Sequence, residues 1–469
     1  STELAGVDAA VYQELIDLKP GSNYSPLAID RTITRIEKVA SDNGLNFVRV
    51  TPVITRNDTF STLDVDFVIE RGPRVFVERI DIKGNSTTLD RVIRTQFDTV
   101  EGDPFNPREI REAAARIRAL GFFAATEVQP REGSSPDTVI VDVEVEEQPT
   151  GSFNFGGTYS VDDGFGLAVS VVERNFLGRG QTLGLSFNTT SGDRALTFNF
   201  LEPSFIGRDV AFFSDGGYIT SRGLNQEFDT ENLFINFGTT FAVSEYGRLS
   251  TSIGWKSLEL SGLEVGASSP ILIREQGKES GGVLGYNYVF ETRGRGLDPT
   301  SGVRVTFGQD LEGVAADGAL LRTGFAVLGQ KAAFGEDVTF RAELEGGVIT
   351  GLGENTTRVT DRYRMTRRQM RGFQSRGIGP RDIAAPNQDA LGANYYCVLR
   401  LEGPFPSGLP EEYNVDLAMF VDNGSLWGLD DTAGFGGVPV DDAFHVRTVV
   451  GFSVIWRSPI GPLRFDFTR

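Results

Sequence analysis

The sequence predicts two small α+β modules followed by an all-β, antiparallel barrel that crosses a membrane. A pattern of one helix and two strands occurs twice near the N-terminus, in residues 1–72 and 73–149. Residues 150–469 instead alternate apolar and polar side chains with a period of two, which is typical of strands. The 469 residues exceed what one hydrophobic core usually holds, so more than one domain is expected.

Composition excludes several classes of function. The chain has 45 basic and 64 acidic side chains, a formal net charge of −19, so we expect no nucleic-acid partner. A single cysteine, Cys397, and a single histidine, His445, exclude an intrachain disulfide and a zinc site built from these residues. The sequence has no phosphate-binding loop of the G-x-x-x-x-G-K-[ST] type, so no nucleotide is expected. We therefore predict no cofactor and no metal.

Two stretches, residues 21–44 and 102–121, carry the helix signals of the repeated pattern. In the second stretch Asn106 is the predicted N-cap, Pro107 occupies the first helical position and Glu109 completes a capping box. The first stretch has a serine and a proline in the same order. Each predicted helix precedes two strands, which together define an α+β module.

Proline interrupts the first of the two strands in each module. Pro52 lies in the stretch VRVTPVI together with Val50, and Pro130 lies in EVQPRE together with Val128. Because proline cannot donate to a strand ladder, both strands are predicted to lie at a sheet edge. Two explanations are open. Proline can simply prevent edge-to-edge aggregation, or the exposed edge can accept an extended peptide by strand addition.

Residues 338–345 illustrate the alternation of the C-terminal segment, where V, F, A and L face one way and T, R, E and E face the other. A soluble two-layer sandwich would give the same alternation. The predicted strands, however, are roughly 9 to 13 residues long, which is the length that crosses a bilayer. There are about fifteen of them, and so large a sheet must close or split. We therefore favour a membrane barrel with apolar side chains outside and charged side chains inside.

Residues 351–387 form a long loop that is rich in arginine although the chain as a whole is acidic. A solvent-exposed loop is the simple explanation. The alternative is a loop folded into the barrel, where acidic side chains of the inner wall would bind the arginines through charge-assisted hydrogen bonds. The predicted inward-facing acidic residues are Glu343, Glu345, Asp416, Asp422 and Asp466. The loop arginines are Arg358, Arg362, Arg364, Arg367, Arg368, Arg371, Arg376 and Arg381.

The segment MRGFQSRGIGPRD at residues 370–382 resembles the loop-six motif of the outer-membrane β-barrel assembly factor family, the BamA type with polypeptide-transport-associated (POTRA) modules. Other segments are similar to the same family, so the resemblance covers essentially the whole chain. They are TGSFNFGGTYS at 150–160, ETRGRGLDPTSG at 291–302, DALGAN at 389–394, LEGPFP at 401–406, FVDNGSLW at 420–427 and WRSPIGPLRFDF at 456–467.

This resemblance implies a sixteen-strand barrel in the outer membrane of Gram-negative bacteria, with the POTRA modules in the periplasm. It implies that the modules receive unfolded outer-membrane proteins and that accessory outer-membrane lipoproteins take part. Clients would enter the bilayer by strand addition at a lateral seam between the first and last strands. The chain begins at the first helix of a module, without its leading strand, and stops at Arg469 in the strand that the family would number fifteen. We therefore expect the last strand to be missing.

The resemblance also implies roles for individual residues. Arg371, followed by Gly372 and Phe373, matches the loop-six motif, and its inner-wall partners correspond to Glu402 and Asp422. Strand parity independently places Glu402 inward, because the leucines of the same stretch take the other face. We predict that these five residues form a latch that holds the loop inside the lumen.

The predicted first barrel strand, residues 151–160, carries the seam. Its glycines offer no side chains to pack, so the strand is either a weak edge that opens at low cost or a strand that curves sharply at the barrel start. The residues assigned to the seam are Gly151, Phe153, Phe155, Gly156 and Gly157. In the last module, the turn that contains Glu101 matches the family's docking site for an accessory lipoprotein.

Other functions differ from assembly in features that can be tested. A POTRA-barrel exporter of the two-partner secretion or translocation-and-assembly type would share the modules, the barrel and the loop motif. A passive porin would lack the modules. A hydrolase would need His445 as its base, yet this residue lies in a polar segment near a strand start, where a solvated histidine is the simpler interpretation. We predict an assembly factor that is not an enzyme, with the exporter as the alternative.

Overall fold

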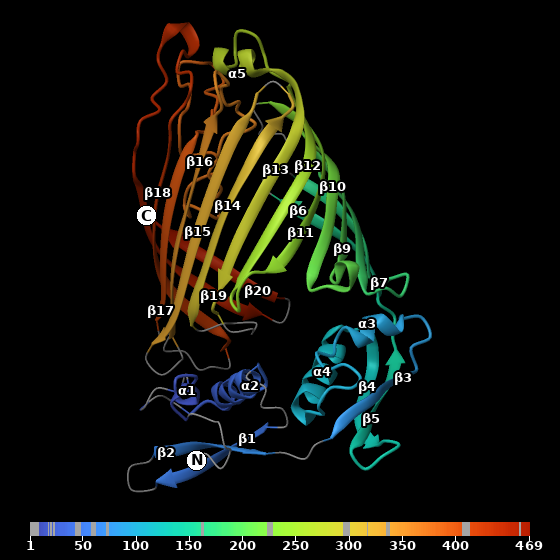
Figure 1. The fold of residues 1–469 in the computed structure, drawn as a ribbon. Helices are drawn as coiled ribbons and strands as arrows, with labels where there is room; N and C mark the ends of the chain where they lie inside the picture. Colours follow the sequence, from blue (N-terminus) through green and yellow to red (C-terminus); the bar gives the residue numbers. More distant parts are fainter. Residues whose placement is uncertain are drawn as a thin grey trace. The chain divides into compact units, whose positions relative to one another are not determined.

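The computed structural model divides the chain into two compact units (Figure 1). The first comprises Ser1–Thr150 with Leu177–Arg179, and the second comprises Gly151–Phe176 with Gly180–Arg469. Residues 294–300, which belong to the ETRGRGLDPTSG motif, lie outside the described residues. The structure describes residues 9–16, 18, 21, 24–42, 48–57, 62–71, 75–160, 164–222, 228–293, 301–316, 318–333, 338–405, 413–458 and 461–469.

The first module contains two helices and a two-stranded antiparallel sheet. Its elements are α1 (Ala9–Gln13), α2 (Pro26–Asp42), β1 (Val48–Asn57) and β2 (Thr62–Arg71). The predicted stripe of α2, formed by Ile29, Ile33 and Ile36, is buried in one core with Val50 and Ile69 of the sheet. An amphipathic helix that covers one face of a small sheet is the arrangement that the sequence pattern predicts.

The last module has a three-stranded sheet in the order β3-β5-β4, with β3 and β5 parallel and β4 and β5 antiparallel. Its elements are β3 (Phe76–Lys83), α3 (Asp90–Arg94), α4 (Pro107–Ala119), β4 (Phe123–Glu132) and β5 (Thr138–Glu147). Helix α4 begins where predicted, because the Asn106 side chain accepts from the Arg108 amide at 3.0 Å and Pro107 occupies the first turn. The predicted capping box is not formed, since the Glu109 carboxylate accepts from the side chains of Asn106, at 3.1 Å, and Thr99 rather than from the Asn106 amide. Ile110 and Ile117 of α4 pack in the module core.

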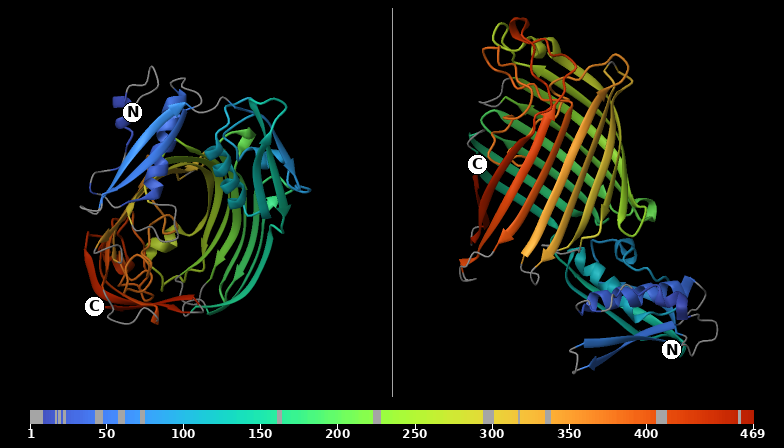
Figure 2. Two further views of the ribbon diagram at one scale, coloured as in Figure 1. Left: turned by 90° about the horizontal axis from the view of Figure 1, so that it is seen from below. Right: turned by 90° about the vertical axis from the view of Figure 1, so that its left-hand side faces the viewer.

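The second unit is one fifteen-stranded antiparallel sheet in which neighbours in sequence are neighbours in space, from β6 to β20. Its strands are β6 (Gly151–Ser160), β7 (Gly164–Phe176), β8 (Gln181–Thr189), β9 (Asp193–Glu202), β10 (Val210–Ser221), β11 (Asp229–Ala242), β12 (Gly247–Ser261), β13 (Gly277–Glu291), β14 (Gly302–Val314), β15 (Leu320–Ala333), β16 (Val338–Gly351), β17 (Tyr395–Phe405), β18 (Val415–Trp427), β19 (Arg447–Ser458) and β20 (Gly461–Thr468). The sheet curls around an interior (Figure 2). A single curled sheet excludes the two-layer sandwich.

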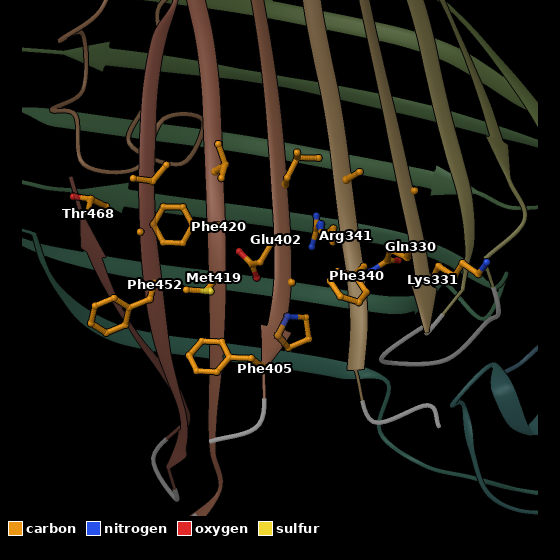
Figure 3. Close-up of a pocket in the computed structure, with 18 of the residues that line it drawn as sticks. Gln330, Lys331, Phe340, Arg341, Glu402, Phe405, Met419, Phe420, Phe452 and Thr468 are labelled. Carbon is orange, nitrogen blue, oxygen red and sulfur yellow. The ribbon is translucent and has the colours of Figure 1, made fainter. Parts of the chain in front are cut away.

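The two faces of the sheet differ as the alternation predicts. On β16, Phe340 is exposed on the outer face, whereas Arg341 and Glu343 form an ion pair on the inner face at 3.1 Å. Around Phe340, residues of β14 to β20 line a pocket that contains the apolar side chains of Met419 and Phe452 and also Arg341 and Glu402 (Figure 3). Exposed apolar side chains on the outside of a barrel are the pattern of a wall that contacts lipid hydrocarbon.

The structure differs from the sequence prediction in two respects. The barrel strands range from 8 residues in β20 to 15 in β12 and β13, a wider range than predicted. A short helix, α5 (Pro270–Glu275), lies between β12 and β13, where no helix was predicted. Its signal was present, because Ser269 caps the helix and Pro270 follows at the first helical position. In the part of the chain that the structure describes, no helix has the length and apolarity needed to cross a bilayer.

Candidate functional site

The loop between β16 and β17 packs against the inner face of the barrel wall through apolar side chains. Met365, Met370 and Ile378 of the loop are buried in one cluster with residues of the wall. The wall residues of this cluster are Val398 on β17, Phe420 and Leu426 on β18, and Val449 on β19. The sequence analysis expected a charged, wet inner wall and therefore missed this dry contact. Burial of apolar surface gives the loop an attachment that does not depend on charge.

Arg371 lies in this loop and contacts two carboxylates of the wall. Its Nε donates to Oδ2 of Asp422 at 2.7 Å, and its Nη2 donates to Oδ1 of the same carboxylate at 2.5 Å. Its Nη1 donates to Oε2 of Glu402 at 2.5 Å. The pairing with Asp422 is bidentate, which is the strongest geometry for an arginine and a carboxylate. The guanidinium carbon also lies 3.6 Å from the centre of the Phe420 ring, so the cation stacks on an aromatic face.

The two carboxylates depend on Arg371 to different degrees. Asp422 is completely buried, and the hydrogen bonds that the structure describes for its carboxylate all come from Nε, Nη2 and the backbone amide of Arg371. Glu402 is partly exposed and also accepts from Arg464 of β20, at 3.2 Å from Nη1 and 2.7 Å from Nη2. The loss of Arg371 would therefore leave Asp422, but not Glu402, without a counter-charge.

Gly372 and Phe373 complete the set of residues that was predicted to form the latch. Gly372 has a φ of +83°, a conformation that glycine adopts without strain. A Cβ atom at this position would lie 2.6 Å from Oγ1 of Thr468 on β20. Phe373 packs at the margin of the apolar cluster. The structure thus brings the predicted latch residues together, and their role in assembly stays a prediction.

In the described part of the barrel sheet, β6 and β20 are the outermost strands, and each pairs with one neighbour, β7 and β19 respectively. Phe153 and Phe155 of β6 are 68% and 67% exposed. A Cβ atom at Gly156 would have no atom within 4 Å, so this part of β6 has little side-chain packing. The residues assigned to the seam, Gly151, Phe153, Phe155, Gly156 and Gly157, therefore all lie on one terminal strand of the sheet. Their part in client insertion stays a prediction.

Comparison with known proteins agrees with this architecture. A family model described as the Omp85 superfamily domain matches residues 175–469. The chain belongs to the Omp85 superfamily. A POTRA model, described as a surface antigen variable number repeat, matches residues 75–148 of this Omp85 chain. The protein is an outer-membrane β-barrel with POTRA modules.

Two relatives of this Omp85 chain are both named outer membrane protein assembly factor BamA. It is 26% identical over its full length to the outer membrane protein assembly factor BamA of Neorickettsia risticii, and 25% identical over 97% of its length to that of Nitratidesulfovibrio vulgaris. It spans 62% and 56% of those two proteins. Its fold is similar to that of the crystal structure of BamA from Haemophilus ducreyi lacking POTRA domains 1–3, with a TM-score of 0.71 and 22% identity over 98% of this chain and 93% of that one.

A second set of contacts holds the loop between β16 and β17 of this Omp85 protein near α5 and the start of β13. The Arg362 side chain is 1% exposed and pairs with Glu275 of α5, and its Nη1 donates to the Leu391 carbonyl at 3.2 Å. Arg358 pairs with Glu279 of β13 at 3.1 Å. Burial raises the pKa of Glu275, although Arg362 opposes this shift. The sequence analysis named both arginines but neither acidic partner, because no local pattern connects residues so far apart.

Two of the predicted acidic partners bind elsewhere. Glu343 and Glu345 lie on the inner face of β16, and Arg400 of the neighbouring β17 pairs with both, at 2.9 Å and 3.6 Å. Arg400 in turn donates to the backbone carbonyl of Arg368 in the loop at 2.7 Å. At this point an arginine of the barrel wall donates to a backbone carbonyl of the loop, whereas the sequence predicted that arginines of the loop would donate to carboxylates of the wall.

The module residues assigned to edge strands lie on β1 and β4. β4 is an end strand of its sheet, and Val128 and Pro130 belong to it. β1 forms a two-stranded sheet with β2 and contains Val50 and Pro52. The Val50 side chain is buried in the core, and its backbone amide donates to Oε1 of Glu37 at 3.2 Å. Part of the β1 edge is therefore already hydrogen-bonded within the module.

Glu101 and His445 lie outside the barrel wall. The Glu101 carboxylate accepts from Nη1 of Arg94 at 2.9 Å and from the Ile80 amide at 3.3 Å, and about half of the side chain is exposed. His445 lies between β18 and β19, is exposed, and its Nε2 is 2.9 Å from Oδ2 of Asp441. This is the solvated position that the sequence analysis expected for His445.

Proposed function

We propose that this protein is the core subunit of the machinery that assembles outer-membrane proteins. It receives unfolded β-barrel clients and inserts them into the bilayer by strand addition. The observation that carries the proposal is the similarity of the whole chain, modules and barrel together, to proteins named outer membrane protein assembly factor BamA. The partners we propose are unfolded outer-membrane clients, accessory outer-membrane lipoproteins and the lipid bilayer.

The modules would receive the client as an extended segment. β4 ends its sheet and offers backbone groups along Val128 and Pro130. Strand addition at such an edge gives affinity through main-chain hydrogen bonds and little dependence on sequence, which suits a receptor for many clients. β1 would contribute less, because Glu37 already occupies the Val50 amide. The turn with Glu101 would dock the accessory lipoprotein, and Arg94 holds that carboxylate in place.

The barrel would pass the client to the membrane at β6. The strand contains Gly156 and Gly157 and leaves the Phe153 and Phe155 side chains exposed, so few side-chain contacts oppose a change of partner. In hydrocarbon every backbone polar group needs a partner, so an open edge favours pairing with an incoming strand. The client's own folding supplies the free energy, and we propose no covalent chemistry by this chain.

The latch would keep the barrel in its working shape while this edge is available. Arg371 ties the loop to β18 through Asp422 and to β17 through Glu402. A bidentate ion pair inside the lumen resists displacement more than an exposed pair does, because less water competes for the charges.

The test uses the purified protein in lipid vesicles with the POTRA modules outside. A small β-barrel client is diluted out of urea onto these vesicles and onto empty ones, and its folded fraction is followed by heat-modifiability on gels. We expect faster client folding with the protein present and no requirement for nucleotide. Equal folding rates in both vesicle types would contradict the proposal. A client that becomes protease-protected inside the vesicle without entering the bilayer would instead indicate an exporter.

A further inference from the structure

The sheet of the last module has two end strands, β3 and β4, on either side of β5. An end strand carries backbone N–H and C=O groups along its outer side, and an extended segment can pair with them. In principle a segment can therefore add to this sheet at either edge. The two edges differ, however, because other parts of the module bind the outer side of β3.

The segment between α3 and α4 pairs with the first part of β3 through its backbone. The Val77 amide donates to the Asp103 carbonyl at 2.9 Å, and the Gly102 amide donates to the Val77 carbonyl at 2.7 Å. Pro104 forms an isolated antiparallel bridge with Phe76. Because proline has no N–H, the outer side of this segment is itself a poor template for another strand. The segment thus covers the start of β3 and ends the sheet there.

Further along β3, two side chains take the place of a neighbouring strand at Ile80. The Ile80 amide donates to Oε1 of Glu101 at 3.3 Å, and the Ile80 carbonyl accepts from Nη2 of Arg94 at 2.9 Å. Nη1 of Arg94 also donates to Oε1 of Glu101 at 2.9 Å, which joins the two side chains into one unit. A carboxylate and a guanidinium therefore occupy the backbone donor and acceptor that an added strand would use.

The backbone contacts matter more than the ion pair itself. The side chains of Arg94 and Glu101 are 41% and 47% exposed, and an exposed ion pair adds little stability. Hydrogen bonds between a charged group and the backbone are stronger than neutral ones. The Ile80 amide, and after it Arg94, holds the pKa of the Glu101 carboxyl below its ordinary value, so the contact favours the ionised form. The pair is therefore in place at neutral pH.

We propose that Glu101 and Arg94 close the β3 edge of the last module, so that an extended client segment adds to this sheet at β4 alone. The identity of the occupant, an unfolded outer-membrane client, rests on the proposed function. The closure itself is a property of the module. The described contacts of Glu101 both use Oε1, so the closure is compatible with docking of an accessory lipoprotein at the same turn.

A single open edge has a consequence for how the module holds a client. A module with two open edges can bind two segments at once and bring two unfolded chains together, which promotes aggregation. A module with one open edge binds one segment at one position. The closure of β3 would therefore make the module a receptor for one client segment at a time.

Hydrogen exchange of the full chain in lipid nanodiscs, read by mass spectrometry, tests the closure without a client. The variant carries Arg94→Ala together with Glu101→Ala. The matched control is Arg79→Ala, because Arg79 lies on the same strand and pairs with the side chain of Asp81 at 2.9 Å. We expect the Ile80 amide to exchange about tenfold faster or more in the variant, since its hydrogen bond to a charged acceptor is lost, and to keep its rate in the control.

A photo-crosslinking amino acid then reports which edge the client uses. It is placed at Lys83 on β3 or at Gln129 on β4, in the full chain in vesicles, and a small β-barrel client is diluted onto them out of urea. We expect client cross-links from position 129 alone in the wild type and in the Arg79→Ala control. The double alanine variant should give cross-links from both positions.

Arg94→Ala alone is a milder variant that serves if the double variant does not fold. It leaves Glu101 on the Ile80 amide and frees only the Ile80 carbonyl. We therefore expect an unchanged exchange rate of that amide and a weaker client cross-link from position 83 than the double variant gives.

The proposal is wrong if the wild type gives client cross-links from position 83 as strong as those from position 129, since β3 would then be open. It is also wrong if the double variant exposes the Ile80 amide to exchange and still gives cross-links from position 129 alone. No client cross-link at either position in any of the proteins would refute the proposed function, and with it the client as occupant. The exchange result would then still decide whether the pair closes the edge, so the two failures are distinguishable.

Discussion

Replacement of Arg371 by methionine should destabilise the barrel mainly through one residue, Asp422. The described hydrogen bonds to the Asp422 carboxylate all come from Arg371, and the side chain is fully buried. Removal of one partner of a buried ion pair typically costs about 3–5 kcal/mol, because the other charge is left without compensation. Glu402 keeps two hydrogen bonds from Arg464, so it should contribute much less to this cost.

This asymmetry predicts which second substitution restores stability. In the Arg371→Met background, Asp422→Asn removes the uncompensated charge and should recover about half of the lost free energy or more, with a residual cost for an amide that lacks partners. Glu402→Gln in the same background should recover little, because it also removes the anion that Arg464 binds. If Arg371 were instead attracted equally to all acidic side chains of the lumen, Asp422→Asn and Glu402→Gln would restore stability to the same extent.

The measurement is urea unfolding of the full chain in lipid vesicles, with the folded fraction read from heat-modifiable mobility on gels. The four proteins to compare are wild type, Arg371→Met and its two double variants. The urea midpoint should be highest for wild type, lower for the Asp422→Asn double variant, and lowest for Arg371→Met and its Glu402→Gln double variant. The slope of the unfolding free energy against urea concentration should be the same for all four proteins. Equal midpoints for the two double variants, or a loss below about 1 kcal/mol for Arg371→Met, would refute the reasoning.

Three further outcomes are expected. Burial raises the pKa of the Glu147 carboxyl, but hydrogen bonds from Ser86, Thr88 and Thr87 outweigh burial and lower this pKa from 4.5 to about 2. The ionised carboxylate therefore stabilises the last module fully above about pH 4.5, and this stabilisation is lost as the pH falls toward 2. Glu147→Gln should abolish this pH dependence, which is measured by hydrogen exchange of the last module at a series of pH values. Gly372→Ala should lower the urea midpoint more than Gly436→Ala, because both glycines have positive φ but only the first would meet Thr468; equal losses would exclude that contact. Gly156→Val should slow client folding on vesicles by stiffening β6, whereas Gly324→Val in β15, which also has open space, should leave it unchanged.

The fold was largely predictable because its signals are local. Alternation with a period of two follows from strand geometry and needs no knowledge of the partner strands. The start of α4 was predictable from Asn106 and Pro107, since both act on the backbone next to them. The short helix α5 has the same kind of signal in Ser269 and Pro270, and it was missed because its surroundings are read as strands.

The candidate site was predictable only in part. Parity placed Glu402 on the inner face, but the choice of Arg371 among eight loop arginines came from resemblance to a family. Phe420 gave a signal that was not used. It is an aromatic residue at an inward-facing position beside Asp422, and there it breaks the alternation because it faces a loop rather than water. The Glu275 partner of Arg362 leaves no local trace, since the pair forms only when α5 and the loop meet.

The strands that the loop contacts are held more firmly than β6, and this follows from where the loop is attached. The loop contacts β17 through Glu402, β18 through Asp422, and β20 through Gly372 and the carboxylate shared with Arg464. On β6, by contrast, Gly156 has open space where a side chain would pack, and Phe153 is largely exposed. Because strand exchange at an edge requires the loss of existing contacts first, the few side-chain contacts of β6 lower the free energy that this strand needs to change partners. We therefore expect the latch to hold β17 and β18 to the loop, while β6 remains the strand that exchanges its partner at the lower cost.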